Sequence, residues 1–410
     1  MWDLAQATVV VFASEAYDIL GDSTATATSQ IARPRNEGNV KRPGPRVRDR
    51  PVRLYVTQTP VWQDIVGAPP ASTNPASLAT SSPTPARIAV PSEAQTATPT
   101  PEAGTPVAYH SFGVRPDGAM RLTGPPSGAS DQNPAFSPDG SLLVFTRFEQ
   151  GYNVGPAGLF LLDLPSGITS RITLYEDQDN VNLPGSSWDA AGNRIVFSSD
   201  RDDADDLWSV SSDGSGLVRI TEHEGSPMYY EPSWSPDGEW VVFEARSSGS
   251  GEDGQAGEIW KVRADGSELT QLTEGYDDRQ PNWSHTLDRV LFQRRGRVEP
   301  DWEIYTMTPN GEDIRPATTS PLSDTDASWS TDGEWIVYSA DHGALPSPNI
   351  FVLPREGGTP IRVTRGDGNE DAAPSWSPDG LWIAFESHNF EDEESPAALW
   401  IIAAPRLSDP

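Results

Sequence analysis

The chain of 410 residues has no cysteine, which excludes disulfides, thiolate metal sites and thiol nucleophiles. It has no run of 18 apolar residues, so no membrane-spanning helix is predicted. Basic residues are scarce: 29 Lys and Arg stand against 60 Asp and Glu, a net charge of −31. A surface so anionic repels phosphate backbones, and we therefore expect no nucleic-acid partner. The apolar stretch at residues 8–13 is too short, and lacks the flanking Lys or Arg, for a readable secretory signal.

The N-terminal quarter has a composition that disfavours packing. Of the 40 residues from 67 to 106, 30 are Pro, Ala, Ser or Thr, which bury little and leave chain entropy unopposed. We interpret 67–106 as a low-complexity tether, and 1–66 as a largely disordered region with a basic stretch at 33–53. Residues 1–106 hold nine basic and nine acidic residues, so the whole net charge falls on residues 107–410.

Residues 107–410 contain a sixfold repeat. An aromatic residue followed by a turn recurs at intervals of 52, 46, 49, 46 and 47 residues, and another aromatic stands nine residues after each of them. The six anchor aromatics are Phe136, Trp188, Trp234, Trp283, Trp329 and Trp376. The six later ones are Phe145, Phe197, Phe243, Phe292, Tyr338 and Phe385. One repeat cannot bury both of its faces alone, so the repeats have to stack against one another. We therefore expect the anchor aromatics to fill the space between neighbouring repeats.

The sequence pattern of each repeat predicts four short antiparallel strands. Ser-Pro-Asp-Gly at 137–140, 235–238 and 377–380 is a tight turn, and an Asp-Gly hairpin leads to a fourth strand that ends in Ile-Thr, Leu-Thr or Val-Thr. Six such units predict an all-β fold, a six-bladed β-propeller of four-stranded antiparallel blades over 107–410. The hairpin 109–123 is expected to complete the last blade. Either Tyr109–Val114 or Leu399–Ala403 is then surplus.

The Pro-x-Trp-Ser-Pro-Asp-Gly segments at 232–238 and 374–380, with the following apolar strand and the Asp-Gly hairpin, resemble the repeat of TolB-type propellers, a WD40-like repeat. The resemblance implies a periplasmic or extracellular, non-catalytic scaffold that docks other proteins, as TolB docks the peptidoglycan-associated lipoprotein. TolB carries a folded α/β domain before its propeller, whereas this chain has a Pro/Thr-rich tether, so only the propeller class carries over. The propeller-bearing peptidases need a Gly-x-Ser-x-Gly elbow, which this chain lacks.

Binding residues on rigid scaffolds usually lie on irregular loops. In these repeats the long connections fall on one face and the tight turns on the other. The long connections carry most of the acidic excess, which favours a basic peptide or protein as the partner of a monomeric chain. The acidic face is represented by Asp202, Asp203, Asp205, Asp206, Asp367, Glu370 and Asp371.

The central channel is the second candidate site. Three residues before the anchors stand Asn133, Gly185, Glu231, Gln280, Asp326 and Ala373. Their four oxygen-bearing side chains, on Asn133, Glu231, Gln280 and Asp326, would bind a hard cation or a peptide end at the channel rim, with ordinary channel waters as the alternative. We assign no cofactor and no metal site. Calcium stays an alternative at the oxygen-rich stretches 177–182 and 367–371, which lack the glycine at the sixth position and the distal glutamate of a calcium loop.

The rival hypothesis is a propeller enzyme, a polysaccharide lyase or hydrolase that works in the channel. Of five histidines, His223, His342 and His388 are expected on the long-loop face. They are too few for a recognisable site, and an anionic face disfavours an anionic polymer. Arg294, Arg295 and Arg297 form the one basic cluster of residues 107–410, explained as pairing with neighbouring acids. The sequence favours a binder and leaves catalysis undecided.

Overall fold

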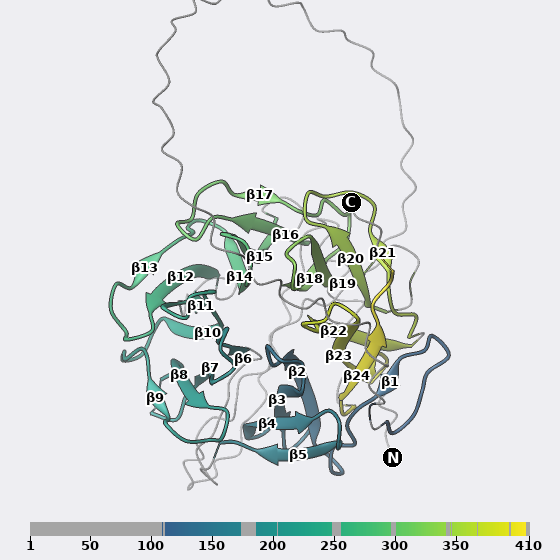
Figure 1. Ribbon diagram of the computed structural model, residues 1–410. Helices are drawn as coiled ribbons and strands as arrows, with labels where there is room; N and C mark the ends of the chain where they lie inside the picture. Colours follow the sequence, from purple (N-terminus) through teal and green to yellow (C-terminus); the bar gives the residue numbers. More distant parts are fainter. Residues whose placement is uncertain are drawn as a thin grey trace, which may run out of the picture. The chain divides into compact units, whose positions relative to one another are not determined.

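The computed structural model describes residue 109 and residues 111–173, 186–202, 204–247, 256–296, 301–341, 345, 347–366, 368–392 and 395–406. Within these ranges 24 strands form six four-stranded antiparallel sheets, and there is no helix. Figure 1 shows the six sheets as blades around a centre, in chain order. The six-bladed β-propeller predicted from the repeat is confirmed. The predictions for the stretch 33–53 and the tether 67–106 lie outside the described residues.

The blades share one strand order, from the channel outward, and we number them 1 to 6 along the chain. The innermost strands are β2 (Ser130–Phe136), β6 (Ser186–Trp188), β10 (Met228–Trp234), β14 (Asp277–Trp283), β18 (Asp324–Trp329) and β22 (Asn369–Trp376). The second strands are β3 (Leu142–Phe148), β7 (Arg194–Ser199), β11 (Trp240–Arg246), β15 (Val290–Arg295), β19 (Trp335–Ala340) and β23 (Trp382–Asn389).

The outermost strand of each blade is the shortest, whereas the third strand is as long as the second in blades 1 to 5. The third strands are β4 (Ala157–Asp163), β8 (Asp206–Ser211), β12 (Gly257–Arg263), β16 (Trp302–Met307), β20 (Asn349–Pro354) and β24 (Ala398–Ala403). The outermost strands are β5 (Ile168–Arg171), β9 (Val218–Arg219), β13 (Thr270–Gln271), β17 (Arg315–Pro316), β21 (Ile361–Arg362) and β1 (Met120–Arg121). Edge strands this short offer little backbone for edge-to-edge pairing.

Blade 6 is built from both ends of the propeller. Its strand order is β1-β24-β23-β22, with Met120 opposite Ile401. The surplus strand is the N-terminal one: the segment around Phe112 lies outside β1, where the Phe112 amide donates to the Arg121 carbonyl at 2.8 Å. The third strand of blade 6 is therefore β24.

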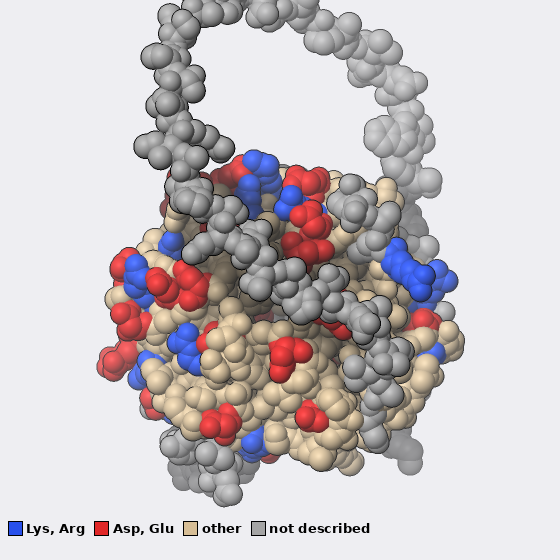
Figure 2. Space-filling model, in the orientation of Figure 1, with Lys and Arg blue, Asp and Glu red and all other residues tan. Residues whose placement is uncertain are grey.

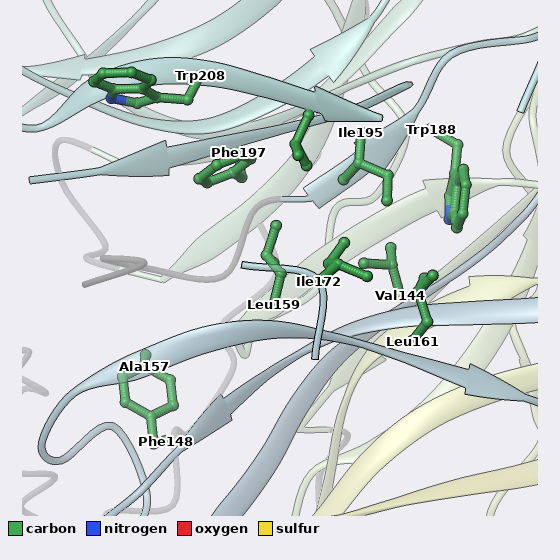
Figure 3. Close-up of a cluster of buried hydrophobic side chains, with 11 residues drawn as sticks. Val144, Phe148, Ala157, Leu159, Leu161, Ile172, Trp188, Ile195, Phe197 and Trp208 are labelled. Atoms are coloured by element: carbon green, nitrogen blue, oxygen red, sulfur yellow. The ribbon is translucent and has the colours of Figure 1, made fainter. Parts of the chain in front are cut away.

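The hydrophobic core is divided into six clusters, one between each pair of neighbouring blades. Every cluster contains the anchor aromatic of one blade and the aromatic nine residues later, packed against aliphatic side chains of the preceding blade. In the cluster of Figure 3, Trp188 and Phe197 of blade 2 meet Val144 and Leu159 of blade 1. The anchors fill the space between blades, as predicted, because neither face of a blade can be buried within it.

The tight turns are closed by their own side chains. The Ser137 hydroxyl donates to Asp139 at 2.6 Å and accepts the Leu142 amide at 3.0 Å. The same pair of bonds recurs at Ser235, Ser330 and Ser377. These hydroxyls explain why serine begins the Ser-Pro-Asp-Gly turn.

The threonine two residues after each outermost strand has one structural role in all six blades. Its Oγ1 accepts the backbone amide of a third-strand residue, for example Ile259 to Thr273 at 3.0 Å. The other five acceptors are Thr123, Thr173, Thr221, Thr318 and Thr364. Burying a backbone N–H without a partner is costly, so the repeated Ile-Thr or Leu-Thr pair follows from this bond.

Candidate binding site in the central channel

The residues three positions before the anchors have a left-handed backbone. Asn133, Glu231, Gln280, Asp326 and Ala373 have φ between 49° and 57°. They lie within the innermost strands, where the register to the second strand shifts, for example between Gln132 and Ala135. Such bulges redirect a side chain out of the sheet, here toward the axis. The equivalent Gly185 lies outside the described residues.

These five residues line one cavity. Its volume is about 140 Å³, and its walls are formed by residues 133–135, 231–233, 280–282, 326–328 and 373–375 together with Ser187. A cavity of about 150 Å³ holds one benzene-sized group, so this one has room for a single guanidinium or ammonium head. The described lining contains the carboxylates of Glu231 and Asp326 and no Lys, Arg or His.

Hydrogen bonds from backbone amides to side chains of the preceding blade hold three residues of this ring. The Asn133 amide donates to Glu386 Oε2 at 2.8 Å, the Gln280 amide to Glu244 Oε2 at 3.3 Å, and the Asp326 amide to Gln293 Oε1 at 3.2 Å. Each acceptor follows the second repeated aromatic of the preceding blade. This position was not among the residues predicted for the site, although it is polar in all six repeats and could have been recognised by that regularity.

Three channel residues form a chain across blades 3 to 5. Gln280 Nε2 donates to Asp326 Oδ1 at 2.6 Å and to Glu231 Oε1 at 3.4 Å. Gln280 Oε1 accepts the Asp326 amide at 3.2 Å. The carboxamide therefore stands between two carboxylates, one of which, on Glu231, is only 4% exposed.

A second buried carboxylate lies at the junction of blades 6 and 1. Glu386 accepts the Tyr152 hydroxyl at 2.8 Å, and the Tyr152 ring stacks on His388 with centroids 4.2 Å apart. Burial raises the pKa of Glu386 to about 7, partly offset by the bonds from Tyr152 and Asn133. His388 Nε2 lies 3.7 Å from Glu370 on the neighbouring strand.

Several acidic residues of the predicted acidic face are buried and have partners inside the protein. Asp206 is fully buried and binds Arg219, Thr221 and His223. Asp205 is buried beside Tyr230, Glu370 beside His388, and Asp371 beside Arg115.

Only part of that predicted set reaches solvent. Asp202 is exposed and lies 3.4 Å from Arg219, while Asp203 and Asp367 lie outside the described residues. Figure 2 shows Asp and Glu interspersed with Lys and Arg around the rim of the face turned to the viewer.

The histidines that the structure describes are dispersed. His223 Nδ1 pairs with Asp206 at 2.8 Å, His388 lies on β23, and His285 lies in the turn after β14 on the tight-turn side. His110, His342 and the stretch 177–182 lie outside the described residues. Within the described ranges no three His, Asp or Glu side chains are grouped to hold a metal ion.

The arginine cluster at 294–297 is partly neutralised. Arg294 binds Asp278 through two bonds of 2.6 and 2.8 Å, and Arg297 is not among the described residues.

The class of protein defined by fold and channel is a six-bladed β-propeller with an acidic axial cavity. Residues 126–301 match the family model described as the TolB beta propeller domain. The TolB resemblance inferred from the repeat is confirmed for this segment, which is less than half of the chain. The part of the chain that the structure describes has no helix able to cross a membrane.

Two curated relatives share part of the sequence. An uncharacterised protein of Agrobacterium fabrum is 30% identical over 183 residues, 44% of this chain and 54% of that protein. The Tol-Pal system protein TolB of Francisella tularensis subsp. mediasiatica is 25% identical over 169 residues, 40% of this chain and 35% of that protein. The matched segments thus span about half or less of these relatives.

Two solved structures share the fold. A TolB candidate from Agrobacterium tumefaciens has a TM-score of 0.50 at 19% identity, covering 67% of this chain and 90% of that one. Oligogalacturonate lyase in complex with manganese has a TM-score of 0.51 at 17% identity, covering 74% and 97%. At such identities the likeness shows the fold alone.

Proposed function

We propose that the chain is a non-catalytic, extracytoplasmic scaffold that binds a basic peptide or protein, with one cationic group entering the central cavity. The observation that carries the proposal is the lining of that cavity, which has two carboxylates and no basic side chain among the described residues. A cation that entered would gain charge-assisted hydrogen bonds in a partly desolvated site. The periplasmic or extracellular location, and the monomeric state, rest on the TolB resemblance.

The structure changes the form of this hypothesis. Because Asp205, Asp206, Glu370 and Asp371 are buried against internal partners, they add little to a surface that steers a ligand. The cavity acids Glu231 and Asp326 instead line the cavity, although the buried Arg246 guanidinium also attracts Glu231. We therefore place the main recognition in the channel and leave the exposed loop acids a role in encounter.

The enzyme alternative has less support. The lyase neighbour shares the fold at 17% identity, and fold alone does not carry function. An acidic cavity repels an anionic polysaccharide. Turnover of such a polymer by the purified chain would favour this alternative over the scaffold.

The test is a fluorescence anisotropy titration of the full chain with labelled acetyl-(Arg-Gly)3-amide, beside the neutral acetyl-(Gln-Gly)3-amide. We expect preferential binding of the arginine peptide, and about tenfold weaker binding with Glu231→Gln or Asp326→Asn. Glu222→Gln is the matched control, because Glu222 lies on a long connection and its side chain is 85% exposed. Thermal melts show that each variant is folded.

Two results would overturn the proposal. Equal affinity for the arginine and the neutral peptide would remove the cationic ligand. An equal loss with Glu222→Gln and Glu231→Gln would move recognition from the channel to the loop surface.

A further inference from the structure

The carboxamide of Gln280 occupies the position that a cationic ligand needs. It is within hydrogen-bond distance of both cavity carboxylates, at 2.6 Å from Asp326 and 3.4 Å from Glu231. A neutral N–H donor in such a place makes weaker bonds than an ammonium or guanidinium group does. A cation that enters can therefore replace the amide, but it has to break these two bonds first.

The opposite side of the ring is arranged differently. Ala373 of blade 6 and Asn133 of blade 1 stand at the positions equivalent to Gln280 and line the same cavity. Alanine offers no polar group. The Nδ2 atom of Asn133 is buried and has no hydrogen-bond partner in the described part of the chain. Leaving a buried donor unpaired is unfavourable, so this side has an unused donor for a ligand acceptor.

We infer that Gln280 is an internal competitor, which holds Glu231 and Asp326 in place in the empty cavity and is displaced by an arginine or lysine side chain of the bound peptide. The inference rests on the proposed function. The main-chain carbonyl beside such a side chain is an acceptor for Asn133 Nδ2. Gln280 thus sets how strongly a cation must bind before the cavity accepts it.

The experiment uses the same titration with two substitutions at one position. Gln280→Lys places an ammonium group between the two carboxylates, and we expect at least about tenfold weaker binding of the arginine peptide, with an unfolding midpoint no lower than that of the wild type. Gln280→Ala removes the competing amide, and we expect binding about three- to tenfold tighter.

Gln271→Lys is the control for added positive charge. Gln271 lies exposed on the outermost strand β13, where its Nε2 donates to the Thr273 carbonyl. We expect this variant to bind the peptide as the wild type does.

The outcomes separate the two proposals. If the wild type binds the arginine peptide and Glu231→Gln weakens it, the proposed function stands whatever Gln280 does. In that case, unchanged affinity with Gln280→Lys, or weaker binding with Gln280→Ala, would overturn the competitor role. If the wild type fails to prefer the arginine peptide, the proposed function itself fails.

Discussion

Arg115 donates to both carboxylate oxygens of Asp371, at 2.8 and 3.0 Å, although the two residues are 256 positions apart. Arg115 belongs to the hairpin that precedes blade 1, and Asp371 lies fully buried on the innermost strand of blade 6. The guanidinium also stacks over Phe385 and Trp400, at 5.3 and 4.9 Å from their ring centroids. One ion pair thus joins the two ends of the propeller.

The first prediction concerns this pair. Arg115→Met keeps the volume but leaves a buried carboxylate without its cation, which should lower the free energy of unfolding by about 3–5 kcal/mol. The double variant Arg115→Met, Asp371→Leu should recover much of that loss, because no uncompensated charge is left. Urea unfolding measures both.

The control for the first prediction is Arg315→Met. It breaks the ion pair with Asp313, in which the Arg315 side chain is 62% exposed, so we expect little or no change. A loss as large as that of Arg115→Met would contradict the argument from burial.

The second prediction concerns the repeated threonine. Thr273→Val keeps the shape but removes the acceptor of the Ile259 amide, and should cost about 1–2 kcal/mol. Thr270→Val, three residues earlier, removes an exposed hydroxyl and should cost less than about 0.5 kcal/mol. Chemical denaturation distinguishes the two, and equal losses would show that the bond to Ile259 is not the cause.

The third prediction concerns pH. The pKa of Glu386 is raised to about 7 from 4.5, so the folded state keeps its proton while the unfolded state releases it. Glu386 therefore contributes its full stabilisation below about pH 4.5. This contribution is lost as the pH rises from about 4.5 to about 7.

Glu386→Gln should remove that fall. Relative to the wild type, the variant should gain up to about 3 kcal/mol between pH 4.5 and pH 8, at 1.36 kcal/mol per pKa unit. Unfolding curves at the two pH values measure this. Glu149→Gln, an exposed carboxylate, is the control, and a parallel gain there would point to a general charge effect.

The fourth prediction separates backbone strain from steric contact. Gly266 and Gly128 have nearly the same φ, 83° and 84°, but a Cβ on Gly266 would lie 2.4 Å from the Ile220 carbonyl oxygen, whereas a Cβ on Gly128 would meet nothing within 4 Å. Both Gly→Ala variants should lower the free energy of unfolding by about 1 kcal/mol, because alanine disfavours the left-handed backbone. Gly266→Ala should lose about 1–3 kcal/mol more, since the turn packs on the preceding blade. Equal melting temperatures would contradict this.

Much of the fold was predictable because its determinants are local and repeated. The anchors, the second aromatics and the Ser-Pro-Asp-Gly turns each recur at fixed spacing, and their positions place them between blades. The surplus strand was not predictable, because Leu399 pairs with Thr123 through one hydrogen bond between residues far apart in sequence. Hydrophobicity alone does not distinguish the two candidate strands.

The site was predictable in position and less so in chemistry. The spacing identified Glu231, Gln280 and Asp326 as channel residues, but a positive φ at a non-glycine residue arises from the bulge and has no local sequence signal. Asp206 begins β8 and Asp371 lies near the start of β22; both stand in charge-rich segments and were interpreted as surface charge. Their partners, Arg219 and Arg115, are found only through the tertiary structure.

The seam in blade 6 also orders events during synthesis. Thr123 and Leu399 are 276 residues apart, so at about 5–20 residues per second a ribosome needs roughly 15 to 55 s to make the second after the first. For that interval the early hairpin of the nascent chain has no third strand to join. The ring can close only after translation has passed β24, so any cellular factor that shields the waiting hairpin must act before then.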